Sequence, residues 1–94
     1  MDATSRYEPN ENIVFREEDE GAFLFDPDSG DLRYMNLTGK ETFSMLNEAS
    51  DVGQLTVELH KLYPEIEPEQ IKRDLEEFLS VLEQNNFIRP VSSE

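Results

Sequence analysis

The stretch from Asp31 to Glu41 constrains the fold most, because its pattern changes from that of a strand to that of a helix within a few residues. Residues 32–35 suit a pleated, half-buried surface. Thr38 with Glu41 three places later matches a capping box, in which two side chains satisfy the first backbone N–H groups of a helix. We therefore expect a strand to end near Asn36 and a helix to begin at about Thr38.

Two further strands are predicted before this junction, so that the strands come first in the chain and the helices second. The turn residues of 26–31 indicate a hairpin between the second and third strands. Alternation places Leu32 and Tyr34 on one face of the third strand and Arg33 and Met35 on the other. The three predicted strands are Ile13–Arg16, Ala22–Phe25 and Leu32–Asn36.

Three helices are predicted after the junction. The first runs from Thr38 to about Leu46 and ends at Asn47, with Gly39 weakening its first turn by up to ~1 kcal/mol. The second is capped by Ser50 or Asp51 and ends at Tyr63-Pro64. The third starts near Pro68 and stops at Asn85-Asn86. Its core stripe is predicted to be Ile71, Leu75, Phe78 and Leu82, widened by Leu79.

These elements predict an α+β fold that is winged helix-turn-helix-like, with an N-terminal three-stranded antiparallel sheet followed by three helices. Residues 1–12 are polar and without periodicity, so we expect a flexible N-terminal tail. The domain is expected to cover residues 13–90, with Phe87-Ile88 folding back onto it. Residues 91–94 are expected to be a C-terminal tail.

The charge of the chain limits its partners. Its 22 acidic and 8 basic residues give a net charge of −14. Phosphate backbones and anionic lipid surfaces would be repelled, so neither nucleic acid nor a membrane is expected as a partner. There is no cysteine, no apolar signal region and no run of about 20 apolar residues, which favours a cytoplasmic location.

No constellation of residues indicates catalysis or metal binding, and we predict no enzyme activity and no cofactor. His60 is the one histidine, and it falls on the polar side of its helix without a partner at ligand spacing. The loop Asp26-x-Asp28-x-Gly30 is similar to a calcium loop, but its glycine comes one place early and Leu37 stands where such loops carry a glutamate.

The order of the motifs resembles that of the PqqD-like family, small peptide chaperones and recognition elements for ribosomally made, modified peptides. The resemblance runs from about Ile13 to Ile88. The segments that carry it are Gly21-Ala22-Phe23-Leu24-Phe25-Asp26-Pro27, Met35-Asn36-Leu37-Thr38-Gly39-Lys40-Glu41, Leu55 through Leu59 to Tyr63-Pro64, Asp74-Leu75-Glu76-Glu77-Phe78-Leu79 with Leu82, and Asn86-Phe87-Ile88.

The resemblance implies that the leader of a precursor peptide adds as a strand beside Leu32–Asn36, in a groove walled by the third helix. The bound peptide would then be presented to a modifying enzyme, often of the radical-SAM type. The peptide-binding residues implied on the strand are Leu32, Arg33, Tyr34, Met35 and Asn36. Those implied on the helix are Lys72, Glu76, Leu79 and Glu83.

Other interpretations of the same residues stay open. Arg33, Tyr34 and Met35 also fit an ordinary edge strand, and Lys72 with Glu76 also fits a solvated helix face. Asn36 is expected to bond nearby backbone at the strand-to-helix corner. The alternative functions are a winged-helix regulator and an acidic protein-interaction domain without a peptide ligand. An open strand edge leaves the chain a monomer or a weak homodimer.

Overall fold

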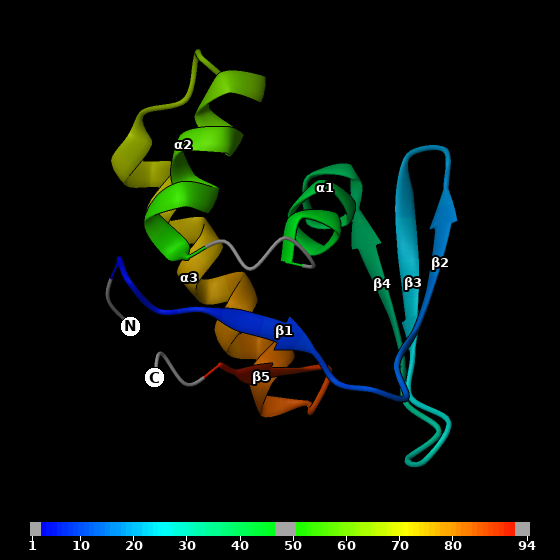
Figure 1. The fold of residues 1–94 in the computed structure, drawn as a ribbon. Helices are drawn as coiled ribbons and strands as arrows, with labels where there is room; N and C mark the ends of the chain where they lie inside the picture. The colour runs from blue at the N-terminus through cyan, green and yellow to red at the C-terminus, as the bar shows by residue number, and fades with distance from the viewer. Residues whose placement is uncertain (1–2, 47–50, 92–94) are drawn as a thin grey trace.

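The computed structural model describes residues 3–46 and 51–91, and it is an α+β domain (Figure 1). A three-stranded antiparallel sheet is followed by three helices, as the sequence predicts, and a small two-stranded sheet joins the two ends of the chain. The elements are β1 Tyr7–Pro9, β2 Val14–Glu18, β3 Gly21–Phe25, β4 Leu32–Asn36, α1 Leu37–Leu46, α2 Val52–Leu62, α3 Pro68–Gln84 and β5 Ile88–Pro90. Asn47 and Ser50, expected at helix ends, lie outside the described residues.

The larger sheet has the strand order β2-β3-β4 and buries one of its faces. Ala22, Leu24 and Met35 are at most 3% exposed, and they share the face that packs on α1. Strand alternation puts the neighbouring side chains on the opposite face. The bounds of β4 are those expected from the sequence, and α1 begins directly after it.

Asn36, rather than Thr38, caps α1. Its Oδ1 accepts a hydrogen bond of 3.0 Å from the backbone N of Gly39, as expected for an asparagine at this corner. The predicted capping box is therefore wrong. Thr38 and Glu41 instead bond the hydroxyl of Tyr63, which joins the start of α1 to the end of α2.

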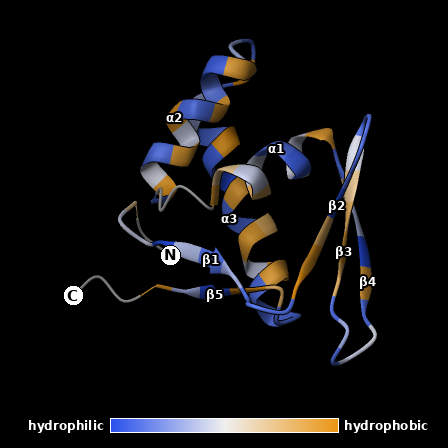
Figure 2. Cartoon of the chain, turned by 45° about the vertical axis from the view of Figure 1, so that its right-hand side comes forward, coloured by the Kyte–Doolittle hydropathy of each residue, from blue (hydrophilic) through white to orange (hydrophobic). Residues whose placement is uncertain are grey.

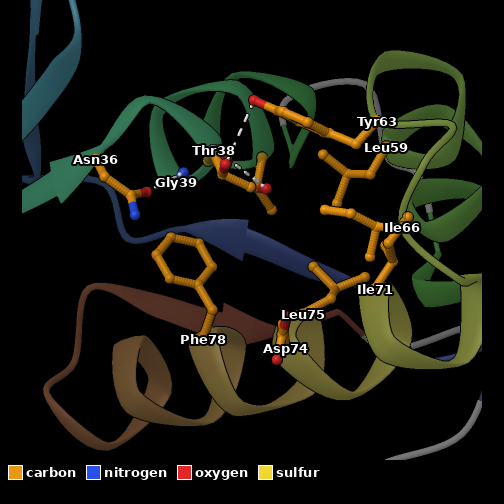
Figure 3. Close-up of a pocket in the computed structure, with 11 residues that line it drawn as sticks. Asn36, Thr38, Gly39, Leu59, Tyr63, Ile66, Ile71, Asp74, Leu75 and Phe78 are labelled. Carbon is orange, nitrogen blue, oxygen red and sulfur yellow. Dashed lines mark hydrogen bonds between the residues drawn. The ribbon is translucent and has the colours of Figure 1, made fainter.

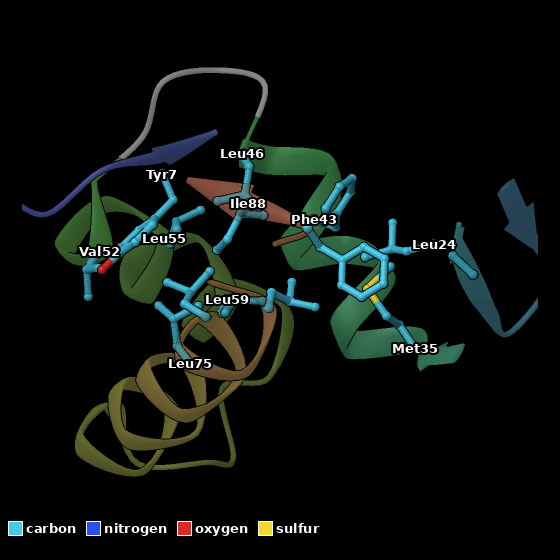
Figure 4. Packing of buried hydrophobic residues seen from close by; sticks show 14 of the residues in the cluster. Tyr7, Leu24, Met35, Phe43, Leu46, Val52, Leu55, Leu59, Leu75 and Ile88 are labelled. Atoms are coloured by element: carbon cyan, nitrogen blue, oxygen red, sulfur yellow. The ribbon is translucent and has the colours of Figure 1, made fainter. Parts of the chain in front are cut away.

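The helices α2 and α3 bury their apolar stripes against each other and against α1 (Figure 4). Asp51 caps α2 by accepting a hydrogen bond of 2.7 Å from the backbone N of Gln54. On α3 the buried residues are Ile71, Leu75, Leu79 and Leu82. Phe78, expected in this stripe, is only partly buried. In the part of the chain that is described, no helix is long and apolar enough to cross a membrane.

The prediction that residues 1–12 form a flexible tail is wrong for the described residues among them. β1 pairs antiparallel with β5, Tyr7 opposite Pro90, and Tyr7 is only 7% exposed. Phe87 and Ile88 fold back into the core, as expected, and their burial brings the two chain ends together. The ordered domain therefore begins before residue 13.

Candidate functional site

The outer edge of β4 has no neighbouring strand in the described parts of the chain, since β4 pairs only with β3. The backbone N of Asp26 donates to the carbonyl O of Asp31, which marks a hydrogen-bonded pair in this ladder. Such pairs alternate along antiparallel strands. The N–H and C=O groups of Leu32 and Tyr34 therefore point away from β3, toward the open edge.

An apolar pocket of about 340 Å³ begins where β4 ends (Figure 3). It lies among the first turn of α1, the end of α2, the segment that follows α2, and one flank of α3. Its walls combine aliphatic side chains with two aromatic rings and few polar groups. The lining residues are Asn36, Thr38, Gly39, Thr42, Leu59, Tyr63, Ile66, Ile71, Asp74, Leu75 and Phe78.

Gly39 allows the pocket wall to form where α1 meets α3. A Cβ at position 39 would lie 3.0 Å from the Cβ of Met35 and 3.2 Å from Cε1 of Phe78. In Figure 3 the ring of Phe78 points from α3 toward this first turn of α1. The glycine that weakens the helix locally thus lets the Phe78 ring lie beside the end of β4.

The polar end of the pocket is held by a short hydrogen-bond chain. The Tyr63 hydroxyl donates to Oε1 of Glu41 at 2.5 Å, and Thr38 Oγ1 donates to the Tyr63 hydroxyl at 3.3 Å. The bond to Glu41 is the main cause that raises the pKa of Tyr63 above 10.0, and burial adds to it. Tyr63 therefore stays neutral across the physiological range and acts as a fixed pocket wall.

The strand residues expected to bind a peptide lie at or beside this edge. Leu32, Arg33, Tyr34 and Asn36 are exposed, and Met35 is buried beneath α1 with 3% of its surface accessible. Met35 therefore offers a peptide at this edge neither its buried side chain nor its backbone N–H and C=O groups, which face β3. Asn36 lines the pocket while its Oδ1 caps α1.

The helix residues expected to wall the groove do not line this pocket. Lys72, Glu76 and Glu83 lie on the other side of the buried stripe of α3 from Asp74 and Phe78, because each residue turns the helix by about 100°. Leu79, expected at the rim, is fully buried at 0% exposure. The residues that α3 presents to the pocket are instead Ile71, Asp74, Leu75 and Phe78.

Asn36 is the one lining residue that the sequence predicts as part of a site, and the other ten lining residues are not predicted there. Phe78 is predicted in the core stripe of the third helix and Tyr63 at the end of the second, and no role is predicted for Ile66. Ile66 was detectable in principle, because it is an apolar residue in a loop between two helices and is 37% exposed. The position of Tyr63 in the pocket wall depends on its hydrogen bond to Glu41, which is 22 residues away, and no local sequence pattern indicates that contact.

The other polar candidates form no site in the described residues. No group of three or more potential metal ligands is present there. Asp26 Oδ1 accepts a hydrogen bond from the backbone N of Asp28, which is the bonding of a tight turn. His60 is half-buried on α2.

Two solved structures share this fold. The structure described as "TbiB1 in Complex with the TbiA(beta) Leader Peptide" has a TM-score of 0.82 and 17% sequence identity, and covers 92% of this chain and 99% of its own. The one described as "Lasso peptide synthetase B1 complexed with the leader peptide" has a TM-score of 0.79 and 20% sequence identity. The match covers 90% of this chain and 99% of the chain in that structure. A comparison with curated protein sequences finds no match.

The sequence also matches a protein family over most of the domain. The family is described as Coenzyme PQQ synthesis protein D (PqqD), and the match covers residues 21–88, from the start of β3 to the start of β5. That range contains β4, α1 and α3, the elements that form the open edge and the pocket. The match covers more than half of the chain, which therefore belongs to the PqqD family.

Proposed function

We propose that this protein binds the leader segment of a ribosomally made precursor peptide by strand addition to β4. The main observation behind the proposal is that β4 has an open edge and ends at an apolar pocket. Unpaired N–H and C=O groups supply affinity for any extended chain, and an adjacent pocket selects among side chains. The edge and pocket together suit a peptide with a defined apolar residue.

The geometry indicates how such a peptide lies. Two hydrogen-bonding positions, Leu32 and Tyr34, can each bond a peptide residue through N–H and C=O. Side chains of the added strand alternate, so one set faces the α3 flank and the other faces the outside of the sheet. Past Asn36 the peptide meets the pocket, where an apolar side chain can pack among Leu59, Ile71 and Phe78.

Charge adds a second element of selection. Asp74 lines the pocket, Glu41 accepts a hydrogen bond from the lining residue Tyr63, and the whole chain carries a net charge of −14. A leader with a basic residue next to its apolar anchor is therefore favoured over an acidic one. The attraction should weaken with added salt, because these groups are near the surface.

The comparisons support this proposal. Both similar structures are described as complexes with a leader peptide, and each matches nearly the whole domain. The family match includes the strand, the helix and the glycine that form the site here. The role we assign is binding and presentation to a modifying enzyme rather than catalysis. We propose an enzyme of the radical-SAM type, which rests on the family resemblance.

A winged-helix regulator that inserts α3 into DNA is disfavoured by the charge of that helix. Its acidic residues are Glu69, Asp74, Glu76, Glu77 and Glu83, against Lys72 and Arg73 as basic ones. A recognition helix normally meets a phosphate-lined groove with basic side chains. An electrophoretic mobility-shift assay at low salt should therefore show no DNA binding.

The proposal is tested by titrating the fluorescently labelled leader of the precursor peptide and following its anisotropy. Phe78→Ala should weaken binding about tenfold, or about 1.4 kcal/mol, because it removes one wall of the pocket. Phe25→Ala is the matched control, since this partly exposed phenylalanine lies in β3 outside the pocket. Equal leader affinities for the two variants, both folded by circular dichroism, would contradict the proposed site.

A further inference from the structure

The outer face of the β2–β3–β4 sheet is apolar and uncovered in the described parts of the chain. The strand register aligns Val14, Phe25 and Leu32 in one row, and Arg16, Phe23 and Tyr34 in the next. Directly opposed residues share a face. Figures 1 and 2 show α1 on the other side of this sheet.

Three large apolar side chains of this face are more than half exposed. Val14 is 52% exposed, Leu32 is 64% and Tyr34 is 56%. A shallow hollow lies among Val14, Arg16, Phe23, Phe25 and Leu32. The rings of Phe23 and Tyr34 pack edge to face at 5.2 Å, so the surface is ordered. An apolar surface with polar residues at its rim is the arrangement found at protein–protein interaction sites.

Acidic turns border the outer face at both ends. The β2–β3 turn region carries Glu17, Glu18, Asp19 and Glu20, and the β3–β4 turn carries Asp26, Asp28 and Asp31. A partner that covers the apolar rows therefore meets negative charge at both ends. The complementary surface has an apolar centre and basic residues at its rim.

A second copy of the chain does not fit this face. Two copies, each with a net charge of −14, would bring acidic turns against one another. Three strands about 4.8 Å apart and about 17 Å long give a face of roughly 250 Å². A stable interface buries about 800 Å² on each partner. The face therefore suits a transient complex with a different protein.

We propose that the outer face is the docking surface for the modifying enzyme, whose matching surface is apolar at the centre and basic at the rim. This inference rests on the proposed function. A leader strand added beside β4 extends the sheet, and every second leader side chain then continues the rows that end at Leu32 and Tyr34. The enzyme therefore docks on a surface made jointly by this protein and the bound peptide, so that the loaded form binds more tightly than the free form.

The test compares Val14→Glu with Val57→Glu. Both valines are 52% exposed and both changes add one negative charge, but Val14 lies on the outer face and Val57 lies on α2. Val14 is on β2, at the far edge of the sheet from β4, so leader binding should be within twofold of wild type for both variants. The probe is the purified enzyme that modifies the leader-bearing precursor.

Enzyme binding to the leader-loaded protein is measured by biolayer interferometry from 50 to 500 mM NaCl. Val14→Glu should weaken docking at least tenfold, Val57→Glu should leave it unchanged, and salt should weaken it for the wild type. The inference would be overturned if the enzyme did not dock, if docking were unaffected by Val14→Glu, or if docking were independent of salt. None of these results would contradict leader binding. A wild-type dimer dissociated by Val14→Glu in analytical ultracentrifugation would overturn it in favour of a second copy. Failure of the leader to bind would instead remove the proposed function.

Discussion

The ring of Phe78 lies against the backbone of Gly39, so closely that a Cβ at position 39 would come within 3.2 Å of its Cε1 atom. This contact brings α3 to the junction of β4 and α1, and it shapes one wall of the pocket. A glycine at position 39 makes the first turn of α1 less stable than an alanine would. The close approach of Phe78 explains why a residue without a side chain stands there.

Gly39→Ala should leave the free energy of unfolding within about 1 kcal/mol of wild type, because the gain in helix propensity opposes the crowding of Met35 and Phe78. The displaced ring should narrow the pocket and weaken leader binding at least threefold. Urea unfolding and leader titration measure the two effects. Gly53→Ala, in the first turn of α2 outside the pocket, is the control, and a matching loss of leader affinity there would refute the explanation.

Tyr63→Phe should remove the hydrogen bonds to Glu41 and Thr38 and reduce stability by about 0.5–1.5 kcal/mol at neutral pH. The pKa of Tyr63 is raised in the folded state, so its contribution is complete below pH 10.0 and is lost as the pH rises through the folded value. Chemical denaturation between pH 7 and 11 checks this. The difference between wild type and variant should be constant to about pH 9 and shrink above pH 10; a constant difference throughout would contradict it.

Asn36→Ala should destabilise the protein by about 1 kcal/mol, because it removes the cap of α1. Asn36→Asp should retain most of the stability, since its carboxylate can accept the same bond from Gly39. Thermal unfolding of both variants measures the difference. Equal losses for alanine and aspartate would show that another property of Asn36 matters.

Tyr7→Ala should destabilise the domain by about 3 kcal/mol, because it removes a buried aromatic side chain from the core. The neighbouring Glu8→Ala removes only an exposed ion pair with Arg89 and should cost less than about 1 kcal/mol. Urea unfolding distinguishes the two. A negligible effect of Tyr7→Ala would restore the interpretation of residues 1–12 as a tail.

The sequence predicts the main elements well where local signals are dense. Turn residues at 26–31 fix the β3–β4 hairpin, and the spacing of Ile71, Leu75 and Leu82 fixes α3. The sequence does not predict the strand β1, because its three residues pair with a segment about 80 positions away and only that distant partner defines the strand. Long-range pairing leaves no periodic signal in so short a strand.

Only the strand side of the candidate site can be predicted from the sequence, because the helix side also depends on long-range packing. The open edge of β4 follows from strand order, but the facing flank of α3 depends on how that helix is rotated about its axis. Phe78 and Leu79 are adjacent and both border the apolar stripe, so periodicity alone does not decide which is buried. Packing against the other elements buries Leu79 and leaves Phe78 beside Gly39. The flank of α3 that faces the pocket is therefore the one that carries Phe78, opposite the flank of Lys72, Glu76 and Glu83.

Residue-resolved amide hydrogen exchange, with and without the leader peptide, tests strand addition to β4 most directly. The amides of Leu32 and Tyr34 point to the open edge and should become protected at least tenfold when the leader binds. The amides of Arg33 and Met35 already face β3 and should change little. By the same alternation, Phe15 and Glu17 point to the other open edge, on β2, and serve as controls. Protection at Phe15 and Glu17 in place of Leu32 and Tyr34, or no alternating protection in β4, would contradict the account.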